Sequence, residues 1–248
     1  QIQRGVGSST NGDGAFGGSI SLATLTPQTT PSLELTGSYG SLNTMNVGMN
    51  FSTGLLWDHL IFDGAYHETN TDGYIHNTEG RSGSYYGSLT WLGDNFTLRY
   101  RNVGNFEKMG QAWSGVTTGN NDATIYGNGV NSYKDMYDKG LGKFNPLTEY
   151  MVFDDDSYEF VKDANGNYQT KRYTMRDGGY WDKTTDNFYQ NHNILSASWK
   201  PTSHWTHNVT LHYTYGYGYY NELKPDAKLA PKFGINETYM KGDELKYT

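Results

Sequence analysis

The 248-residue chain contains no cysteine, which excludes disulfides and thiolate metal sites. It has no run of 18 apolar residues, so no segment is expected to cross a bilayer as a helix. The formal net charge of -7 argues against a nucleic-acid partner, because phosphate binding needs a basic face. The chain begins at Gln1 rather than at Met, and we expect it to be a piece of a longer polypeptide.

Aliphatic residues are sparse for a chain of this length, whereas aromatic residues are abundant. Hydrophobic residues make up 35% of the chain and aromatic residues 15%, with 22 tyrosines, and the mean hydropathy is -0.75. This composition is too polar for a conventional core and too aromatic for a disordered chain. A β-barrel with lipid on one face and water on the other needs this mixture, because its strands carry apolar side chains only at alternate positions.

Alternation of apolar and polar residues marks seven segments that are separated by turn signals. They cover residues 32–39, 44–53, 60–66, 84–91, 96–101, 193–200 and 208–220. One face of each segment carries Leu, Met, Phe, Tyr or Trp, and the other carries mainly Ser, Thr, Asn, Gly, Arg or His. The apolar faces end in Trp or Tyr near the turns, where a membrane barrel has its aromatic girdles.

The connections favour a barrel over a soluble β-sandwich, which also alternates. Short and long connections follow one another, as they do in outer-membrane barrels, although the "GSLN" connection at 40–43 departs from this by being short. We therefore predict an all-β chain. Residues 32–248 are expected to form part of a transmembrane antiparallel β-barrel, about seven strands of it, with a long extracellular loop at about 106–187.

The predicted long loop is aromatic and polar, which is typical of a loop that grips a ligand. The alternative is a loop that merely covers the barrel mouth. Asn165-Gly166 lies between two alternating arms and predicts a hairpin inside it. Candidate ligand-binding residues in this region are Trp113, Tyr126 and Tyr133.

Two arginines are predicted to point inward near the outer end of their strand. Arg99 and Arg101 lie on the polar face of the 96–101 segment. They either attract an anionic ligand or pair with carboxylates inside the barrel.

The stretch "GDGAFGG" at 12–18 satisfies the G-x-G-x-x-G pattern of a dinucleotide-binding loop. That loop needs a helix after it, whose N-terminus meets the phosphate. The alternating segment that follows ends at Pro27 and has no helical period. We therefore reject the nucleotide site.

Other motifs for chemistry also lack a supporting context. His204 and His207 have H-x-x-H spacing, but on a strand this spacing points them to opposite faces. The segment from Asp163 begins like a calcium loop, yet Tyr168 stands where that loop requires Gly. We expect no metal site, no cofactor, no catalytic residues and no enzymatic activity.

Residues 1–24 carry a more specific pattern. A segment ending in Arg4-Gly5 is followed by Ser8-Ser9, Asn11-Gly12, Ala15 and Gly17-Gly18, and then by a short apolar segment that ends at Thr24. This order resembles the end of the plug domain of TonB-dependent outer-membrane receptors, with Asn11-Gly12 in place of the family's usual Tyr-Gly. The seven alternating segments after it extend the resemblance along the whole chain.

The resemblance implies that residues 1–26 are the C-terminal end of a plug domain and that the seven strands begin a 22-stranded barrel. It implies that Arg4 joins an ion-pair lock between plug and barrel. The glycines, namely Gly5, Gly12, Gly14, Gly17 and Gly18, then serve as tight turns of the plug.

The same resemblance implies a transport function and a location. The protein would be a receptor in the outer membrane of a Gram-negative bacterium, in contact with outer-membrane lipid. It would take up a large, scarce solute, with a ferric siderophore or another iron complex as the favoured ligand. An inner-membrane TonB energy-coupling complex would be its partner. The alternatives are a passive porin or adhesin-type barrel and a secreted carbohydrate-binding β-sandwich.

Overall fold

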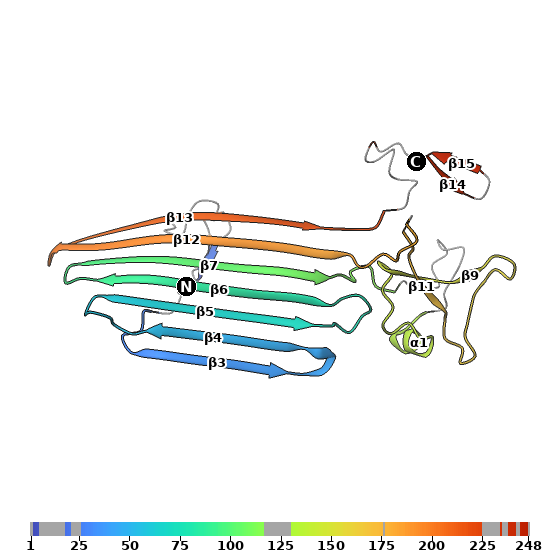
Figure 1. The fold of residues 1–248 in the computed structure, drawn as a ribbon, viewed down its shortest axis with the longest axis horizontal. Helices are drawn as coiled ribbons and strands as arrows, with labels where there is room; N and C mark the ends of the chain where they lie inside the picture. Colours follow the sequence, from blue (N-terminus) through green and yellow to red (C-terminus); the bar gives the residue numbers. More distant parts are fainter. Residues whose placement is uncertain are drawn as a thin grey trace.

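A computed structural model describes residues 26–116, 130–175, 177–224 and 234, together with four short strands outside these ranges. The chain is mostly β-structure, dominated by one antiparallel sheet of seven strands (Figure 1). Within the described residues, no helix combines the length and apolar character needed to cross a membrane.

The seven strands of the large sheet lie in the order β13-β12-β7-β6-β5-β4-β3, so each strand pairs with its neighbour in the chain apart from the β7–β12 step. Their bounds are β3 Pro31–Tyr39, β4 Met45–Thr53, β5 Leu60–Thr71, β6 Gly80–Leu92, β7 Phe96–Gly110, β12 Thr185–Thr202 and β13 Trp205–Tyr220. Each contains one of the seven segments predicted from alternation, apart from Thr44, which precedes β4; the prediction of an antiparallel, mostly β fold is confirmed.

The strands next to the long connection are longer than the sequence predicted. The loop was placed at about 106–187, but β7 continues to Gly110 and β12 already begins at Thr185, so the connection is 111–184. The prediction failed there because the apolar–polar alternation fades near this end, where Asn, Glu, Lys and Asp occupy both faces. Backbone pairing continues nonetheless, with Gly110 opposite Thr185.

The strands lengthen from β3 toward β12 and β13, mainly at the end of the sheet with the short turns. One row of paired residues runs through Ser32, Ser52, Asp63, Ser88, Arg101, Ile194 and His212. At the end with the short turns, β3 begins one residue before its member of this row, β5 three residues before, β7 five and β13 seven. At the other end, β3, β5, β7 and β13 extend seven, eight, nine and eight residues beyond the row, so the strand ends next to the 111–184 connection are nearly level and the strands lengthen toward β13.

The two faces of the sheet differ in chemistry. The face that we call the apolar face carries Leu33, Met49, Phe62, Leu89, Leu98, Leu195 and Leu211. The opposite, polar face carries cross-strand hydrogen bonds such as Asn50 Nδ2 to Glu34 (2.9 Å) and Ser88 Oγ to Asp63 (3.1 Å). The exposed apolar side chains, Leu33 at 67% and Leu211 at 62%, show that the sheet's apolar face is not covered by the rest of the described chain.

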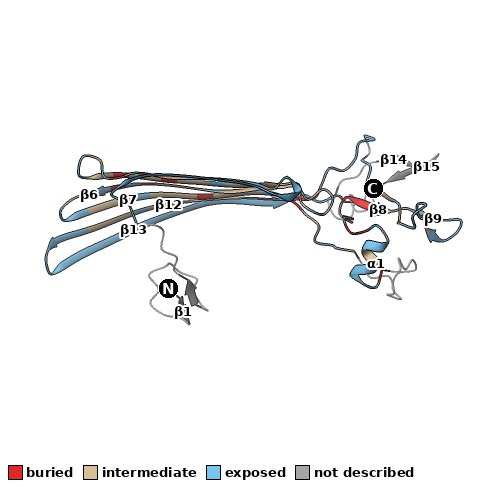
Figure 2. Cartoon of the chain, turned by 90° about the horizontal axis from the view of Figure 1, so that it is seen from below, coloured by how far each residue is buried: buried red, intermediate tan, exposed pale blue. Residues whose placement is uncertain are grey.

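The connection 111–184 folds into a small unit of its own beyond one end of the sheet (Figures 1 and 2). Its described elements are α1 (Tyr133–Asp138), β8 (Glu149–Met151), β9 (Phe153–Asp154), β10 (Glu159–Phe160) and β11 (Thr170–Arg172). A small core of Val130, Leu141 and Phe144 holds it together. We call it the loop unit.

The hairpin predicted around Asn165-Gly166 is present in the loop unit. Lys162 pairs with Tyr168, and Gly166 adopts a φ of 86°, which favours glycine. The Asp163 carboxylate accepts the backbone N–H groups of Asn165 (2.8 Å) and Asn167 (2.9 Å). Asp163 therefore fixes a turn, the role that the sequence favoured over a calcium site.

Two short strands lie in the N-terminal region. β1 (Ile2–Arg4) pairs antiparallel with β2 (Gly18–Ile20), and Arg4 lies opposite Gly18. The other plug-turn glycines, Gly5, Gly12, Gly14 and Gly17, lie outside the described residues. At the other end of the chain, β14 (Thr238–Lys241) pairs with β15 (Glu244–Tyr247).

Candidate functional site

Two short rows of aromatic side chains lie on the apolar face, one across β7 and β12 and the other across β7, β12 and β13. At the end with the short turns, Phe96 of β7 lies opposite Trp199 of β12. Toward the loop unit, Phe106 lies opposite Tyr189, and Tyr189 lies opposite Tyr217. On both β7 and β12 the two rows are ten residues apart. The sequence predicted aromatic residues at the strand ends, but the register is needed to see that they lie opposite one another in two rows.

A polar cluster lies between the two rows. Asn102 Nδ2 donates to the side-chain oxygens of Asn191 (3.1 Å) and Asn193 (2.9 Å). Asn191 donates to the Tyr85 hydroxyl (2.7 Å), and the Tyr100 hydroxyl donates to Asn193 (2.6 Å). The amides thus bond one another and two tyrosines, which lowers the cost of removing them from water.

Tyr85 of this cluster lies over a glycine. A Cβ added to Gly104 would meet the Tyr85 ring at 2.1 Å, and one added to Gly83 would meet the Phe106 ring at 2.4 Å. Only a residue without a side chain leaves room for these rings. The glycines therefore set the positions of two aromatic residues on the apolar face.

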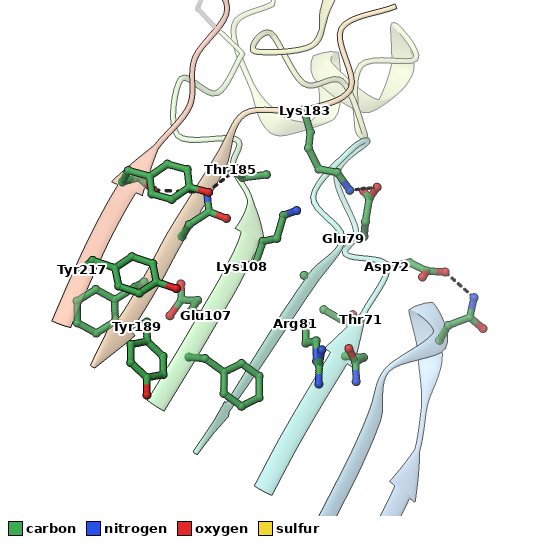
Figure 3. Close-up of a pocket in the computed structure, with 17 residues that line it drawn as sticks. Thr71, Asp72, Glu79, Arg81, Glu107, Lys108, Lys183, Thr185, Tyr189 and Tyr217 are labelled. Atoms are coloured by element: carbon green, nitrogen blue, oxygen red, sulfur yellow. Dashed lines mark hydrogen bonds and ion pairs between the residues drawn. The ribbon is translucent and has the colours of Figure 1, made fainter. Parts of the chain in front are cut away.

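A groove of about 610 Å³ opens at the aromatic row that is nearer the loop unit (Figure 3). Side chains of the apolar face supply much of its lining. They include Arg81, Phe106, Lys108, Asn187, Tyr189, Tyr217 and Tyr219. Glu79 and Lys183 close the groove at the loop end, where they form an ion pair.

The Glu79–Lys183 pair links two loops. Glu79 belongs to the β5–β6 connection and Lys183 to the end of the 111–184 connection. Burial acts to raise the pKa of the Glu79 carboxyl, but the hydrogen bond and charge of Lys183 outweigh it, so this pKa is lowered from its ordinary value. The pair is stabilising while Glu79 is ionised.

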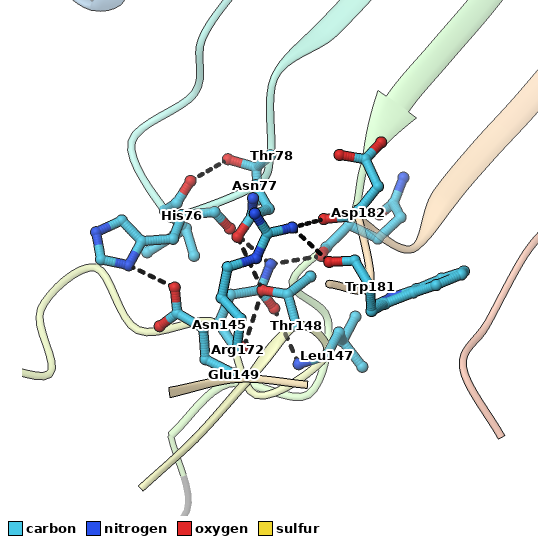
Figure 4. A network of polar contacts seen from close by, with 12 residues as sticks. His76, Asn77, Thr78, Asn145, Leu147, Thr148, Glu149, Arg172, Trp181 and Asp182 are labelled. Atoms are coloured by element: carbon cyan, nitrogen blue, oxygen red, sulfur yellow. Dashed lines mark hydrogen bonds and ion pairs between the residues drawn. The ribbon is translucent and has the colours of Figure 1, made fainter. Parts of the chain in front are cut away.

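A second set of contacts fastens the loop unit to the β5–β6 connection (Figure 4). Asn145 is fully buried, and its Nδ2 donates to the carbonyl oxygens of His76 (2.8 Å) and Gln111 (3.0 Å). Its Oδ1 accepts the Leu147 N–H (3.1 Å). His76 Nδ1 lies 2.8 Å from the Glu149 carboxylate. The loop unit is thus held to the sheet end by polar contacts centred on Asn145.

The two predicted arginines lie on the polar face. Arg99 donates to the Tyr86 hydroxyl (2.7 Å) and Arg101 to Ser196 Oγ (2.9 Å). Both are nearer the short 93–95 turn than the 111–184 connection, because β7 continues from them to Gly110. That this part of the strand lies toward the outside stays a prediction.

The loop residues predicted to bind ligand are not gathered with these arginines. Trp113 packs edge-on against Tyr220, with ring centroids 6.0 Å apart, beyond the far end of β7. Tyr133 begins α1 and is 84% exposed. Tyr126 lies outside the described residues. The described members of the predicted set therefore do not form one site.

A smaller groove of about 400 Å³ lies on the polar face. It is lined by Thr36, Asn46, His67, Thr69, Ser82, Ser84 and Asn105, among others. His67 Nε2 contacts the Asn50 side chain (3.0 Å), and the Thr69 hydroxyl donates to Asn46 (2.6 Å). This surface offers hydroxyls and amides, which suit a hydrophilic ligand or a polar protein segment.

Comparison with family models, with curated proteins and with solved structures gave no match. In the described part of the chain, no cluster of three or more His, Asp or Glu side chains could hold a metal ion. The residues that sequence reasoning missed are Asn145, Lys108 and Glu79. No local pattern marks them, because their roles depend on which segments meet at the sheet end.

Proposed function

We propose that this chain is part of a TonB-dependent outer-membrane transporter, in which the seven-stranded sheet is a section of the barrel wall. The resemblance of residues 1–24 to the end of a plug domain supports the family. The sheet supports the membrane barrel, through its two chemically different faces, its two aromatic rows and its edges.

The separation of the two aromatic rows is the observation that carries the proposal. Ten residues along β7 lie between Phe96 and Phe106. At the tilt of about 35–45° that transmembrane barrels have, ten residues of about 3.3 Å each would rise about 23–27 Å along the barrel axis. The apolar band of an outer-membrane barrel is about 25 Å tall and is bordered by an aromatic girdle at each interface. The two rows have the spacing of these girdles.

The edges of the sheet also support a larger assembly. β3 and β13 are the edge strands, and each has one side without a partner among the described residues. An exposed edge as long as the 16 residues of β13 is a site for pairing with another strand. Further strands of the same barrel would remove both edges.

The transport mechanism follows from the two faces. The apolar face would contact lipid, and the polar face would line the lumen, where a hydrophilic ligand passes. The loop unit would lie on the extracellular side, where it connects the end of β7 to the start of β12. An inner-membrane TonB complex would supply the energy by acting on the plug, and the chain itself performs no covalent chemistry. An iron chelate is the proposed cargo, by analogy with the family.

The test uses the full-length protein in its membrane. Cells that make it are fractionated, and uptake of radiolabelled ferric catecholate, ferric hydroxamate and haem is measured with and without a working energy-coupling complex. We expect the protein in the outer membrane, and uptake of one of these compounds that is lost without coupling. Surface binding should remain.

Other outcomes separate the alternatives. Uptake that is independent of the coupling complex would indicate a passive porin-type barrel. A protein that folds in water and stays out of the membrane fraction would contradict the barrel and favour the soluble β-sandwich. Coupled uptake of a different solute would reject only the iron cargo.

A further inference from the structure

Two histidines of the β12–β13 hairpin face each other on the polar face of the sheet. His192 Nδ1 lies 3.3 Å from His212 Nε2, and the two rings stack with centroids 5.5 Å apart. The Thr214 hydroxyl lies 3.0 Å from His192 Nδ1 and 3.1 Å from His212 Nε2. Two nitrogens and one oxygen therefore form a triangle with edges of 3.0 to 3.3 Å.

The register of the hairpin brings these side chains together. His192 lies opposite Thr214, and His212 lies opposite Ile194, which is two residues further along β12. Because side chains alternate between the faces of a strand, the two histidines share one face as diagonal neighbours. They are 20 residues apart in the sequence, so no short metal-binding motif marks them.

The size of the triangle matches the spacing of ligand atoms around a metal ion. Imidazole nitrogens bind Zn²⁺ at about 2.0–2.1 Å, so two ligands of one ion lie about 2.9 to 3.4 Å apart for ligand–metal–ligand angles between 90° and the tetrahedral angle. All three edges of the triangle fall in this range. Small rotations of the three side chains would therefore aim their lone pairs at one ion, and water would complete its coordination.

The surroundings of the two histidines indicate the kind of ion. Their neighbours on the polar face of the described sheet are Val103, Gln190, Ile194, Thr210 and Gly216. None of these is a carboxylate, and the positively charged Arg101 lies two strands from His212 in the same row. Calcium and magnesium ions need oxygen ligands, mainly carboxylates, whereas neutral imidazole suits copper, nickel and zinc. The surroundings therefore favour an ion that is held by coordination to nitrogen rather than by opposite charge.

The geometry points to an open binding site for a divalent late transition-metal ion, namely Cu²⁺, Ni²⁺ or Zn²⁺. His192 Nδ1 and His212 Nε2 would bind the ion, and the Thr214 hydroxyl would be a third, weaker contact. The other ring nitrogens, His192 Nε2 and His212 Nδ1, would carry the protons. The inference is independent of the transporter proposal, because β12 and β13 form the site by themselves.

The test titrates Cu²⁺ into the full-length protein, purified in detergent without a polyhistidine tag. Continuous-wave and pulsed electron paramagnetic resonance count the imidazoles bound to the ion, and competition with a chromogenic chelator gives the Kd. We expect a Cu²⁺ signal with two bound imidazoles. An excess of Zn²⁺ should displace the Cu²⁺, whereas the same excess of Mg²⁺ should not.

Variants connect the metal signal to this pair. His192→Gln and His212→Gln should each raise the Kd of Cu²⁺ by about tenfold or more and reduce the bound imidazoles from two to one, because each removes a nitrogen ligand. His67→Gln is the matched control. It makes the same change on the same face, but His67 Nε2 contacts the Asn50 side chain (3.0 Å) rather than a histidine, so the Kd and the signal should stay unchanged. Circular dichroism melting checks that each variant is folded.

Three results would overturn the inference. They are the absence of a two-imidazole Cu²⁺ signal from the parent protein, binding by folded His192→Gln and His212→Gln that equals that of the parent, and an equal loss of binding in His67→Gln. The last result would mean that scattered histidines hold the ion. Each of these leaves the transporter proposal standing if coupled uptake persists, and a protein found outside the membrane fraction would remove the transporter proposal without affecting this test.

Discussion

Substitution of Asn145 tests whether polar contacts hold the loop unit to the sheet. The Asn145 side chain makes three hydrogen bonds, to His76, Gln111 and Leu147, and it is fully buried. A net hydrogen bond is worth about 1 kcal/mol, and a buried group left without a partner costs more. Asn145→Ala should therefore lower the free energy of opening of the loop unit by about 3 to 5 kcal/mol.

Asn145→Asp sharpens this prediction. The carboxylate can still accept the Leu147 N–H, but it places a negatively charged oxygen against the two carbonyl oxygens that the amide had bonded. Its cost should equal or exceed that of Asn145→Ala, although its shape is conserved. A role for Asn145 in packing alone predicts the opposite order.

The assay is hydrogen–deuterium exchange followed by mass spectrometry on the detergent-solubilised protein. Exchange should accelerate in peptides from 130–175, while peptides from β12 and β13 keep their protection. Asn95→Ala is the control, because Asn95 is an exposed asparagine in the β6–β7 turn. Equal exchange in Asn145→Ala and Asn95→Ala would refute the reasoning.

Three further predictions concern other described contacts. Gly104→Ala should destabilise the sheet by about 1 to 3 kcal/mol, because its Cβ would overlap the Tyr85 ring, whereas Gly87→Ala, with nothing within 4 Å, should change urea unfolding by no more than about 0.5 kcal/mol. The lowered pKa of Glu79 means that its contribution is present above the unfolded pKa and is lost as pH falls through the folded value; proteolysis of the loop unit should therefore increase below about pH 4.5, and this contribution should be absent in Glu79→Gln. Asp163→Ala should speed amide exchange in the 159–172 hairpin at neutral pH, whereas Asp163→Asn, which keeps an acceptor oxygen, should do so less.

Alternation was sufficient to predict the seven strands, because each has an apolar face and a polar face in the segment where the two differ. It was insufficient near the loop unit. The β5 strand continues through Glu68 and Asn70, and β7 continues through Glu107 and Lys108, where both faces are polar. Backbone hydrogen bonding to the next strand continues across such segments. It cannot be predicted from alternating hydrophobicity, because it does not depend on the side chains.

The candidate sites depended on long-range register to a greater extent. The position of Arg101 relative to the short turn follows only once β6 and β7 are paired and the full length of β7, Phe96–Gly110, is known. The groove needs Arg81, Lys108 and Asn187, from three strands, in one row. For the two arginines, the sequence predicted only that they lie on the polar face of the sheet, because this depends on local alternation.

The loop unit has a consequence for how the chain folds. β7 and β12 are separated by roughly 70 residues, and closing so long a flexible loop is slow and costs more entropy than closing a turn. Its two ends meet, because the Gln111 N–H donates to the Thr184 carbonyl (2.8 Å). If the loop unit forms first, the remaining closure resembles a hairpin turn and its entropic cost falls by about 2 kcal/mol. The folded unit would then hold the start of β12 next to the end of β7. Every strand of the sheet could therefore be added next to the strand before it.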